Sequence, residues 1–412
     1  MSLVRNTFWN LSGYIIPSII AIPSLGFLAR SLGPERFGLY TLAIALVGYA
    51  SIFDAGLTRA VIREISYFRN KDSEIRKIIS NSTIILTFLG VLGGGVIYFG
   101  SGNIVNFLKV DYSLQAETKY AIELLSLTLP FFLLNQVWLG VMEGYEQFKK
   151  INIIKTFNSS FIVGLPALFV YFKSNLLYAI MGLVLARFLS LVITFFSCKK
   201  NIITSGFLFD VNIAKRLLKY GGWITVSNVV SPLMAYLDRF FISNIIGASN
   251  VAFYTAPAEG VQRLSVFPGA LSRAIFPKLS RLVSKQEKDK QKKLAYVLMA
   301  GAIFPLCVIG FLSAEKIMTL WMGSAFSGLS ASILKILLVG FFFNCIAQIP
   351  FADIQAAGKS KITALLHLCE VMPYLLLLFL SIHIYGIIGA AFAWSIRTTI
   401  DCFLLIWLNN KI

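Results

Sequence analysis

Apolar residues run along this chain in stretches of about 20, separated by short polar segments. A membrane-crossing helix needs about that length, because the hydrocarbon core is about 30 Å thick and each helical residue adds about 1.5 Å. The pattern therefore predicts twelve spanning helices, at 8–29, 37–58, 79–100, 118–142, 152–172, 176–197, 220–246, 250–272, 294–313, 329–352, 362–382 and 386–408. Several connections, such as 30–36 and 383–385, are so short that they predict antiparallel helical hairpins.

Composition identifies the bilayer as the main solvent of this chain. Of the 412 residues, 57% are hydrophobic and only 14% are charged, and the mean hydropathy is +0.76. A soluble domain carries about 25% charged residues. We therefore expect an all-α membrane protein with about twelve transmembrane helices.

The positions of the basic residues predict the orientation of the chain. If the N-terminus is cytoplasmic, 26 of the 37 Lys and Arg residues lie at cytoplasmic ends and loops, and seven lie on the opposite side. The positive-inside rule then places both termini in the cytoplasm. This bias accounts for most of the net charge of +18, so no nucleic-acid partner is needed. The basic run at 278–293 is interpreted as a solvated cytoplasmic loop, with contact to anionic lipid headgroups as the alternative.

A diverged repeat suggests that the fold is duplicated. Residues Gly33–Ser66 align without a gap to Gly247–Ser280, at a constant offset of 214, and ten of the 34 positions are identical. Six predicted helices precede the segment 198–219 and six follow it. An even number of helices per half gives both halves the same orientation, as in a parallel repeat. We therefore predict an N-terminal lobe at 1–197, a cytoplasmic linker at 198–219 and a C-terminal lobe at 220–412, forming two pseudo-symmetric six-helix lobes around a central cleft.

Ionisable residues inside the predicted helices are candidates for function, because each costs about 2.5–3.5 kcal/mol to insert. They are Asp54, Glu123, Arg187, Asp238, Arg239, Glu259, Arg263, Glu370, Arg397 and Asp401. Glu259–Arg263 and Arg397–Asp401 share helix faces at i,i+4, so each pair can also be an internal ion pair that only fixes packing. Arg187 has no acidic residue within four positions, and its planar guanidinium suits phosphate recognition.

Arg59 and Arg273 occupy equivalent positions in the two copies of the repeat. They are interpreted either as residues that anchor the helices by the positive-inside rule or as a symmetric cationic entrance for an anionic headgroup. The five cysteines are scattered singly and the chain has only two histidines, so we expect no metal site and no cofactor. The longest predicted connection on the non-cytoplasmic side, near 101–117, is too short for a catalytic domain, so we do not expect an enzyme.

Three stretches resemble a known family. They are ARSLGPERFGLYTLA after the first predicted helix, FDAGLTRAVIREIS at the end of the second, and YLDRFFISNIIGASNVAFYTAP in the seventh and eighth. They are similar to polysaccharide-biosynthesis exporters of the multidrug/oligosaccharidyl-lipid/polysaccharide exporter superfamily, and above all to Wzx-type O-antigen and capsule flippases. The resemblance implies a bacterial inner-membrane protein that moves undecaprenyl-diphosphate-linked oligosaccharides by alternating access.

Under this resemblance, the arginines become candidates for binding the diphosphate. We expect Arg187, Arg239 and Arg263 to bind it, with Arg59 and Arg273 as entrance contacts. Asp238 and Glu259 would orient these arginines, or bind a coupling proton or sodium ion. The implied partners are the lipid-linked oligosaccharide and membrane lipids, with a polysaccharide polymerase and chain-length proteins as further candidates.

Three alternatives stay open at this stage. A cation-coupled multidrug antiporter of the same superfamily would need an acidic, aromatic cavity, to which Asp54, Glu123 and the 35 phenylalanines are suited. A membrane glycosyltransferase or polymerase is disfavoured by the short external loops. A non-transporting scaffold of a polysaccharide-assembly complex would differ from a flippase in lacking translocation.

Overall fold

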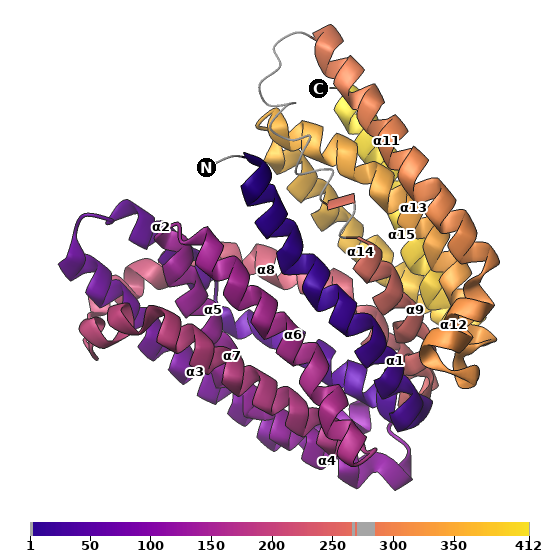
Figure 1. Cartoon of the computed structure of the whole chain (residues 1–412), viewed down its shortest axis with the longest axis horizontal. Helices are drawn as coiled ribbons and strands as arrows, with labels where there is room; N and C mark the ends of the chain where they lie inside the picture. Colours follow the sequence, from indigo (N-terminus) through magenta and orange to yellow (C-terminus); the bar gives the residue numbers. More distant parts are fainter. Residues whose placement is uncertain (1–2, 266–267, 270–284, 412) are drawn as a thin grey trace. The chain divides into compact units, whose positions relative to one another are not determined.

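The computed structural model describes residues 3–265, 268–269 and 285–411, and in this part of the chain the regular elements are helices (Figure 1). Contacts divide the chain into two compact units, Met1–Phe240 and Phe241–Ile412, with the break inside one helix. Nine helical stretches of the described residues are long and apolar enough to cross a membrane. One of them, Ile16–Asp54, overlaps the first two predicted spans, 8–29 and 37–58. The predicted spans at 220–246 and 250–272 include residues without described side chains, so the total of twelve stays a prediction.

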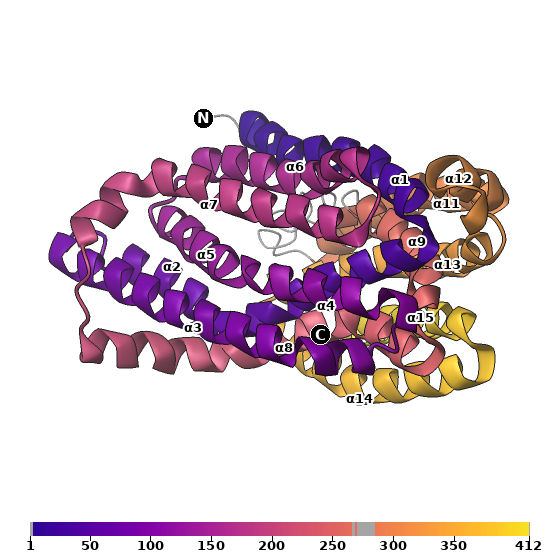
Figure 2. The same ribbon diagram turned by 90° about the horizontal axis from the view of Figure 1, so that it is seen from below.

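Unit 1 is built from seven helices and most of an eighth. They are α1 (Leu3–Tyr49), α2 (Leu57–Tyr67), α3 (Asp72–Phe107), α4 (Tyr112–Ser126), α5 (Thr128–Gly144), α6 (Phe148–Phe172), α7 (Leu176–Ser205) and α8 (Val211–Ile246). Helices α6 and α7 lie side by side, and α1 runs along α6 (Figure 2). A buried apolar cluster joins α2, α3 and α5, with Leu57, Ile78 and Leu133 fully inaccessible. Large apolar side chains such as Phe99 of α3 are exposed instead, as expected where lipid is the solvent.

The second predicted helix, 37–58, is interrupted in the structure. Helix α1 ends at Tyr49, a 3₁₀ turn (η1) covers Ala50–Asp54, and α2 starts at Leu57. Ala55 and Gly56 adopt left-handed conformations, with φ of 47° and 67°. A Cβ at Gly56 would overlap the carbonyl oxygen of Gly221 on α8, so the close approach of two backbones requires this break. The apolar run did not reveal it, because hydrophobicity alone does not record a turn.

The connection between α7 and α8, at 206–210, is tied to α3. Ser80 accepts a hydrogen bond from the Leu208 amide and donates to the Gly206 carbonyl. The Asn81 side chain bonds to the backbone of Leu208 and of Asp210. Lys77 lies 3.3 Å from the Asp210 carboxylate, and this hydrogen bond lowers the pKa of Asp210 below its usual value. The segment that links the predicted halves is therefore held to unit 1 by directed polar contacts.

The described part of unit 2 contains six further helices and two 3₁₀ turns. They are η2 (Ala248–Asn250), α9 (Val251–Leu264), α11 (Lys285–Leu312), α12 (Ala314–Met322), η3 (Ser324–Phe326), α13 (Leu329–Ala356), α14 (Ser360–Tyr385) and α15 (Ile387–Asn410). Helix α13 packs against α9, α11 and α15, and α14 packs against α15 (Figures 1 and 2). Ala347, Ile354, Cys402 and Leu405 form a buried cluster between α13 and α15.

The described parts of the two repeats adopt the same local structure. Gly33 has φ 72° and ψ 169°, and its counterpart Gly247 has φ 96° and ψ 151°, a region that is essentially restricted to glycine. In both copies a threonine hydroxyl bonds to the carbonyl three residues earlier, from Thr41 in one repeat and Thr255 in the other. The two repeats therefore share a local backbone conformation at the turn glycines, and the pseudo-symmetry of two six-helix lobes stays a prediction.

Candidate substrate-binding site

Arg187 is held inside unit 1 by aromatic rings. It lies on α7, and its guanidinium carbon sits 4.8 Å from the centre of the Phe132 ring on α5. Tyr40 and Tyr236 lie in the neighbourhood of this charge. Its Nε is buried and has no hydrogen-bond partner among the described residues. The side chain is thus a cation supported by ring faces, with hydrogen-bonding capacity left over for a ligand.

Arg239, on α8, lies beside the same tyrosine. Its side chain is buried, and its guanidinium carbon is 5.3 Å from the centre of the Tyr236 ring. Asp238 is also buried, and its carboxylate accepts the backbone N–H of Arg239 at 2.8 Å. Two of the three predicted diphosphate-binding arginines, Arg187 and Arg239, therefore both have Tyr236 as a neighbour, although 52 positions separate them in the sequence.

The tyrosines of this cluster were not predicted as site residues. The Tyr236 ring packs over Gly48 of α1, where a Cβ would lie 3.0 Å from the ring. Tyr49 makes edge contacts with Tyr236 and Phe240, at centroid distances of 6.3 and 5.3 Å. A signal was present in the sequence, because Tyr40 is one of the identities of the repeat and Tyr236 opens the YLDR stretch. Spacing along one helix could not show which rings lie near the arginines.

Arg263 and Glu259 lie in unit 2, on α9. Their side chains form the i,i+4 ion pair that the spacing predicts, with 3.5 Å between Arg263 and the Glu259 carboxylate. The third predicted arginine therefore belongs to a different unit from Arg187 and Arg239. Its role in diphosphate binding stays a prediction.

Of the two predicted entrance residues, only Arg59 lies among the residues that the structure describes. Arg59 lies on α2 and is exposed, one turn after the 3₁₀ segment that ends at Asp54. The Asp54 carboxylate accepts a 2.6 Å hydrogen bond from the Thr58 hydroxyl. Arg273 lies outside the described residues.

A second polar cluster, which the sequence did not suggest, lies between α14 and α15. His367 Nε2 is 3.6 Å from the Asp401 carboxylate, and the His367 ring stacks on Phe351. Potential ligand atoms of His367, Glu370 and Asp401 all lie within 4.8 Å of one another. Asp401 thus contacts His367, whereas its i,i+4 neighbour Arg397 lies over the Tyr374 ring at 5.0 Å. Arg397 carries a positive charge beside this cluster, and that charge opposes cation binding. The expectation that the chain has no metal site stays a prediction.

Comparison with known proteins relates the whole chain to surface-polysaccharide systems. Residues 3–283 match the family model described as polysaccharide biosynthesis protein. A Shigella flexneri protein described as a putative O-antigen transporter is 47% identical over 411 residues, which cover 100% of this chain and 98% of that protein. The lipopolysaccharide biosynthesis protein WzxC of Escherichia coli (strain K12) is 22% identical over 319 residues, covering 74% of this chain and 61% of that protein.

Solved structures with the same fold include transporters of two kinds. The lipid II flippase MurJ, in an inward closed conformation, matches with a TM-score of 0.76 and 16% identity, over 99% of this chain and 88% of MurJ. An inward-facing multidrug resistance MATE family transporter of the MOP superfamily matches with a TM-score of 0.75 and 14% identity, over 97% and 94%. At these identities the likeness establishes the fold. Together with the family model and the Shigella flexneri relative, it shows that this chain belongs to the polysaccharide biosynthesis protein family.

Proposed function

We propose that this chain is a flippase that moves an undecaprenyl-diphosphate-linked oligosaccharide, an O-antigen or capsule repeat unit, across the bacterial inner membrane. The observation that carries the proposal is the 47% identity over the whole chain to a protein described as a putative O-antigen transporter. The fold it shares with a lipid II flippase supports the same kind of reaction. A sugar chain and a diphosphate cannot cross hydrocarbon unaided, because buried unpaired polar groups and charges cost too much free energy.

The arginines around Tyr236 are suited to the charged part of this substrate. Arg187 and Arg239 both lie within the helices of unit 1, where Arg239 lies over the Tyr236 ring and Arg187 lies over the Phe132 ring with Tyr236 nearby. Guanidinium groups donate parallel charge-assisted hydrogen bonds to phosphate oxygens. In our proposal these two arginines bind the diphosphate, Asp238 orients Arg239, and the prenyl tail stays in lipid.

Unit 2 supplies a second, weaker set of candidates. Arg263 is already paired with Glu259. It would therefore bind the diphosphate either while still in contact with Glu259 or after that ion pair has broken. Glu259 then either orients Arg263 or takes a coupling proton or sodium ion when the arginine turns to substrate. Arg59, which is exposed on α2, and Arg273 act as entrance contacts in this scheme.

The orientation and the assembly partners belong to the same proposal. Both termini lie in the cytoplasm, and a polysaccharide polymerase and chain-length proteins receive the flipped unit. Reporter fusions at the C-terminus and at 173–175 test the orientation. A reporter that requires the cytoplasm should be active only at the C-terminus, and activity at 173–175 would contradict it.

Sidedness of the lipid-linked oligosaccharide is the direct test of the function. Inverted inner-membrane vesicles expose their cytoplasmic leaflet, where membrane-impermeant periodate oxidises accessible sugars. In vesicles that contain the chain, the oligosaccharide should be protected, and removal of the gene should make it oxidisable. Equal accessibility in both preparations, with altered drug resistance, would instead indicate a multidrug antiporter. Equal accessibility without that change would indicate a scaffold.

A further inference from the structure

A basic pocket lies at one end of unit 1, where α6 begins and α7 approaches its end. Its volume is about 460 Å³, and its lining includes Lys150 from α6 and Lys199 and Lys200 from α7. The side-chain amides of Gln147 and Asn201 also line it. This pocket is separate from the arginine cluster around Tyr236 and has no role in the proposed transport reaction.

A break in α7 shapes this pocket. Cys198 has the non-helical angles φ −119° and ψ 16°, directly before the two lysines. Lys150 donates a hydrogen bond to the carbonyl of Ser197 at this break, so one lysine stabilises the distorted turn. The Cys198 thiol bonds to the Thr194 carbonyl at 3.1 Å. Lys199 and Lys200 follow the break and remain exposed.

The charge around the pocket favours an anion. Its lining contributes three lysines and no carboxylate. Two acidic side chains next to this part of the chain are engaged elsewhere, since Glu146 pairs with Arg69 at 3.1 Å and Asp210 pairs with Lys77. Ammonium groups and amide N–H groups together offer only donors to a ligand that is rich in acceptor oxygens, as a phosphate is.

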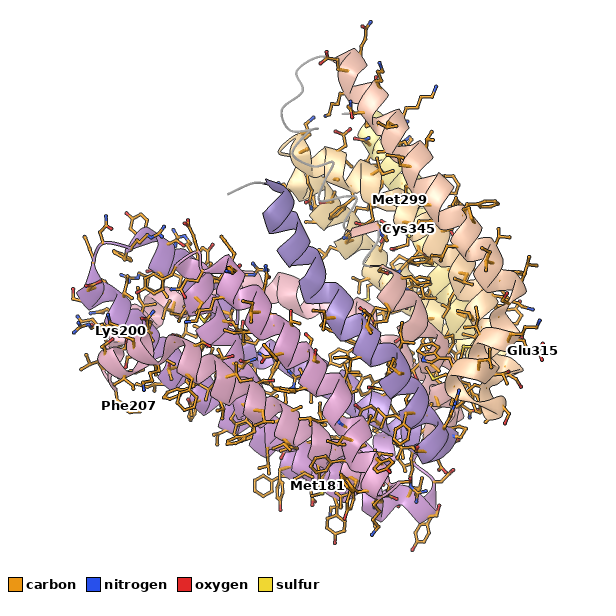
Figure 3. The ribbon with its side chains drawn as sticks, viewed as in Figure 1. Met181, Lys200, Phe207, Met299, Glu315 and Cys345 are labelled. Atoms are coloured by element: carbon orange, nitrogen blue, oxygen red, sulfur yellow. The ribbon has the colours of Figure 1, made fainter. Side chains whose placement is uncertain are left out.

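The surroundings of the pocket are apolar, which favours a lipid over a free anion. Phe196, which lines the pocket, is 66% exposed, and Phe148 at the start of α6 is 57% exposed. Phe207, in the connection after α7, is 90% exposed, and Figure 3 shows it at the same end of the unit as Lys200. Exposed aromatic rings beside lysines are typical of the membrane–water interface, where rings contact acyl chains and amines reach headgroups.

We propose that this pocket binds the phosphodiester headgroup of an anionic membrane phospholipid. Lys199 and Lys200 contact the phosphate, the amides of Gln147 and Asn201 complete its hydrogen bonds, and the acyl chains lie against Phe196 and its neighbours. In the orientation that the charge bias predicts, the lipid belongs to the cytoplasmic leaflet. The bound lipid would fix the kinked end of α7 against the start of α6.

Native mass spectrometry of the full chain, titrated with phosphatidylglycerol or phosphatidylcholine, tests this site. The double variant Lys199→Ala/Lys200→Ala should bind phosphatidylglycerol roughly 30-fold more weakly, which is about 2 kcal/mol at 1.4 kcal/mol for each tenfold change. Binding of phosphatidylcholine should hardly change. Arginine at both positions should restore phosphatidylglycerol binding, because arginine keeps the charge and suits phosphate.

The matched control removes the same charge elsewhere. Lys359→Ala/Lys361→Ala changes two exposed lysines of unit 2 and should leave phosphatidylglycerol binding unaltered. An equal loss in both double variants would overturn the proposal, because it would indicate unspecific attraction to charge. Competition by inorganic phosphate at the affinity of the lipid would also overturn it, in favour of a free-anion site. None of these outcomes depends on whether the chain transports an oligosaccharide.

Discussion

Replacement of Arg187 by methionine should separate substrate binding from stability. Methionine keeps much of the side-chain length but removes the charge and the hydrogen-bond donors. A hydrogen bond to a charged group contributes about 1.5–3 kcal/mol. If Arg187 binds the diphosphate, the flipping rate at limiting substrate should fall roughly 10- to 150-fold.

Stability should change little, or in the opposite direction. The contact of Arg187 with the Phe132 ring, at 4.8 Å, contributes about 2 kcal/mol for a desolvated cation. A charged residue inside a membrane helix costs about 2.5–3.5 kcal/mol. The cost exceeds the gain, so Arg187→Met should unfold at the same temperature as the unaltered chain or higher. Arg187→Lys should be intermediate in rate, because it keeps a charge but loses the planar fork.

Two assays on each variant decide the outcome. Periodate protection in inverted vesicles gives the flipping rate, and thermal unfolding of the purified chain gives the stability. Lys173→Met is the control, because Lys173 also lies over a ring, that of Tyr178 at 5.7 Å, but is exposed. A normal flipping rate in Arg187→Met would refute the diphosphate assignment. A fall in both rate and unfolding temperature would make Arg187 a structural residue.

Three further changes test the scaffold that carries the site. Gly56→Ala should greatly reduce the yield of folded chain, measured by size-exclusion chromatography, because the new Cβ overlaps the Gly221 carbonyl at a residue with positive φ. Asn81→Ala should lower stability by roughly 2 kcal/mol in thermal unfolding, because two bonds to the 206–210 connection are lost at about 1 kcal/mol each. Acid should loosen the same connection, measured by limited proteolysis. The pKa of Asp210 is lowered by Lys77, so its stabilising contribution is complete above the unfolded value of about 3.9 and disappears as pH falls through the folded value.

Each of these three has a control or an outcome that would contradict it. Gly95→Ala introduces a methyl group where no atom lies within 4 Å, so its yield should be normal, and an equal loss would point to glycine content rather than the Gly56 contact. Unchanged unfolding of Asn81→Ala would mean that the connection contributes little to stability. The acid effect should disappear in Lys77→Met, and its persistence there would assign it to other carboxylates.

The tertiary structure differs most clearly from the predictions made from the sequence where helices meet. The sequence predicts a continuous second helix at 37–58. In the structure the helix ends at Tyr49, because the backbones of Gly56 and Gly221 come into close contact. Spacing suggested that Arg397 and Asp401 pair along α15, whereas Asp401 contacts His367 of the neighbouring helix α14. In both cases the competing partner is distant in the sequence, and a pattern along one helix carries no information about it.

The sequence by itself determined that lipid is the main solvent, where most of the spanning segments lie, that the chain contains a repeat, and which family it belongs to. These properties are local or linear, since the bilayer selects about 20 apolar residues at a time and a turn glycine such as Gly33 or Gly247 is needed by its own backbone angles. The sequence also identified Arg187 and Arg239 by their cost inside a membrane helix. Only the tertiary structure decided that Arg187 lies over Phe132 and Arg239 over Tyr236, with Tyr236 near both arginines. These neighbours depend on how α5, α7 and α8 pack, and side-chain partners across helices are fixed by packing rather than by spacing.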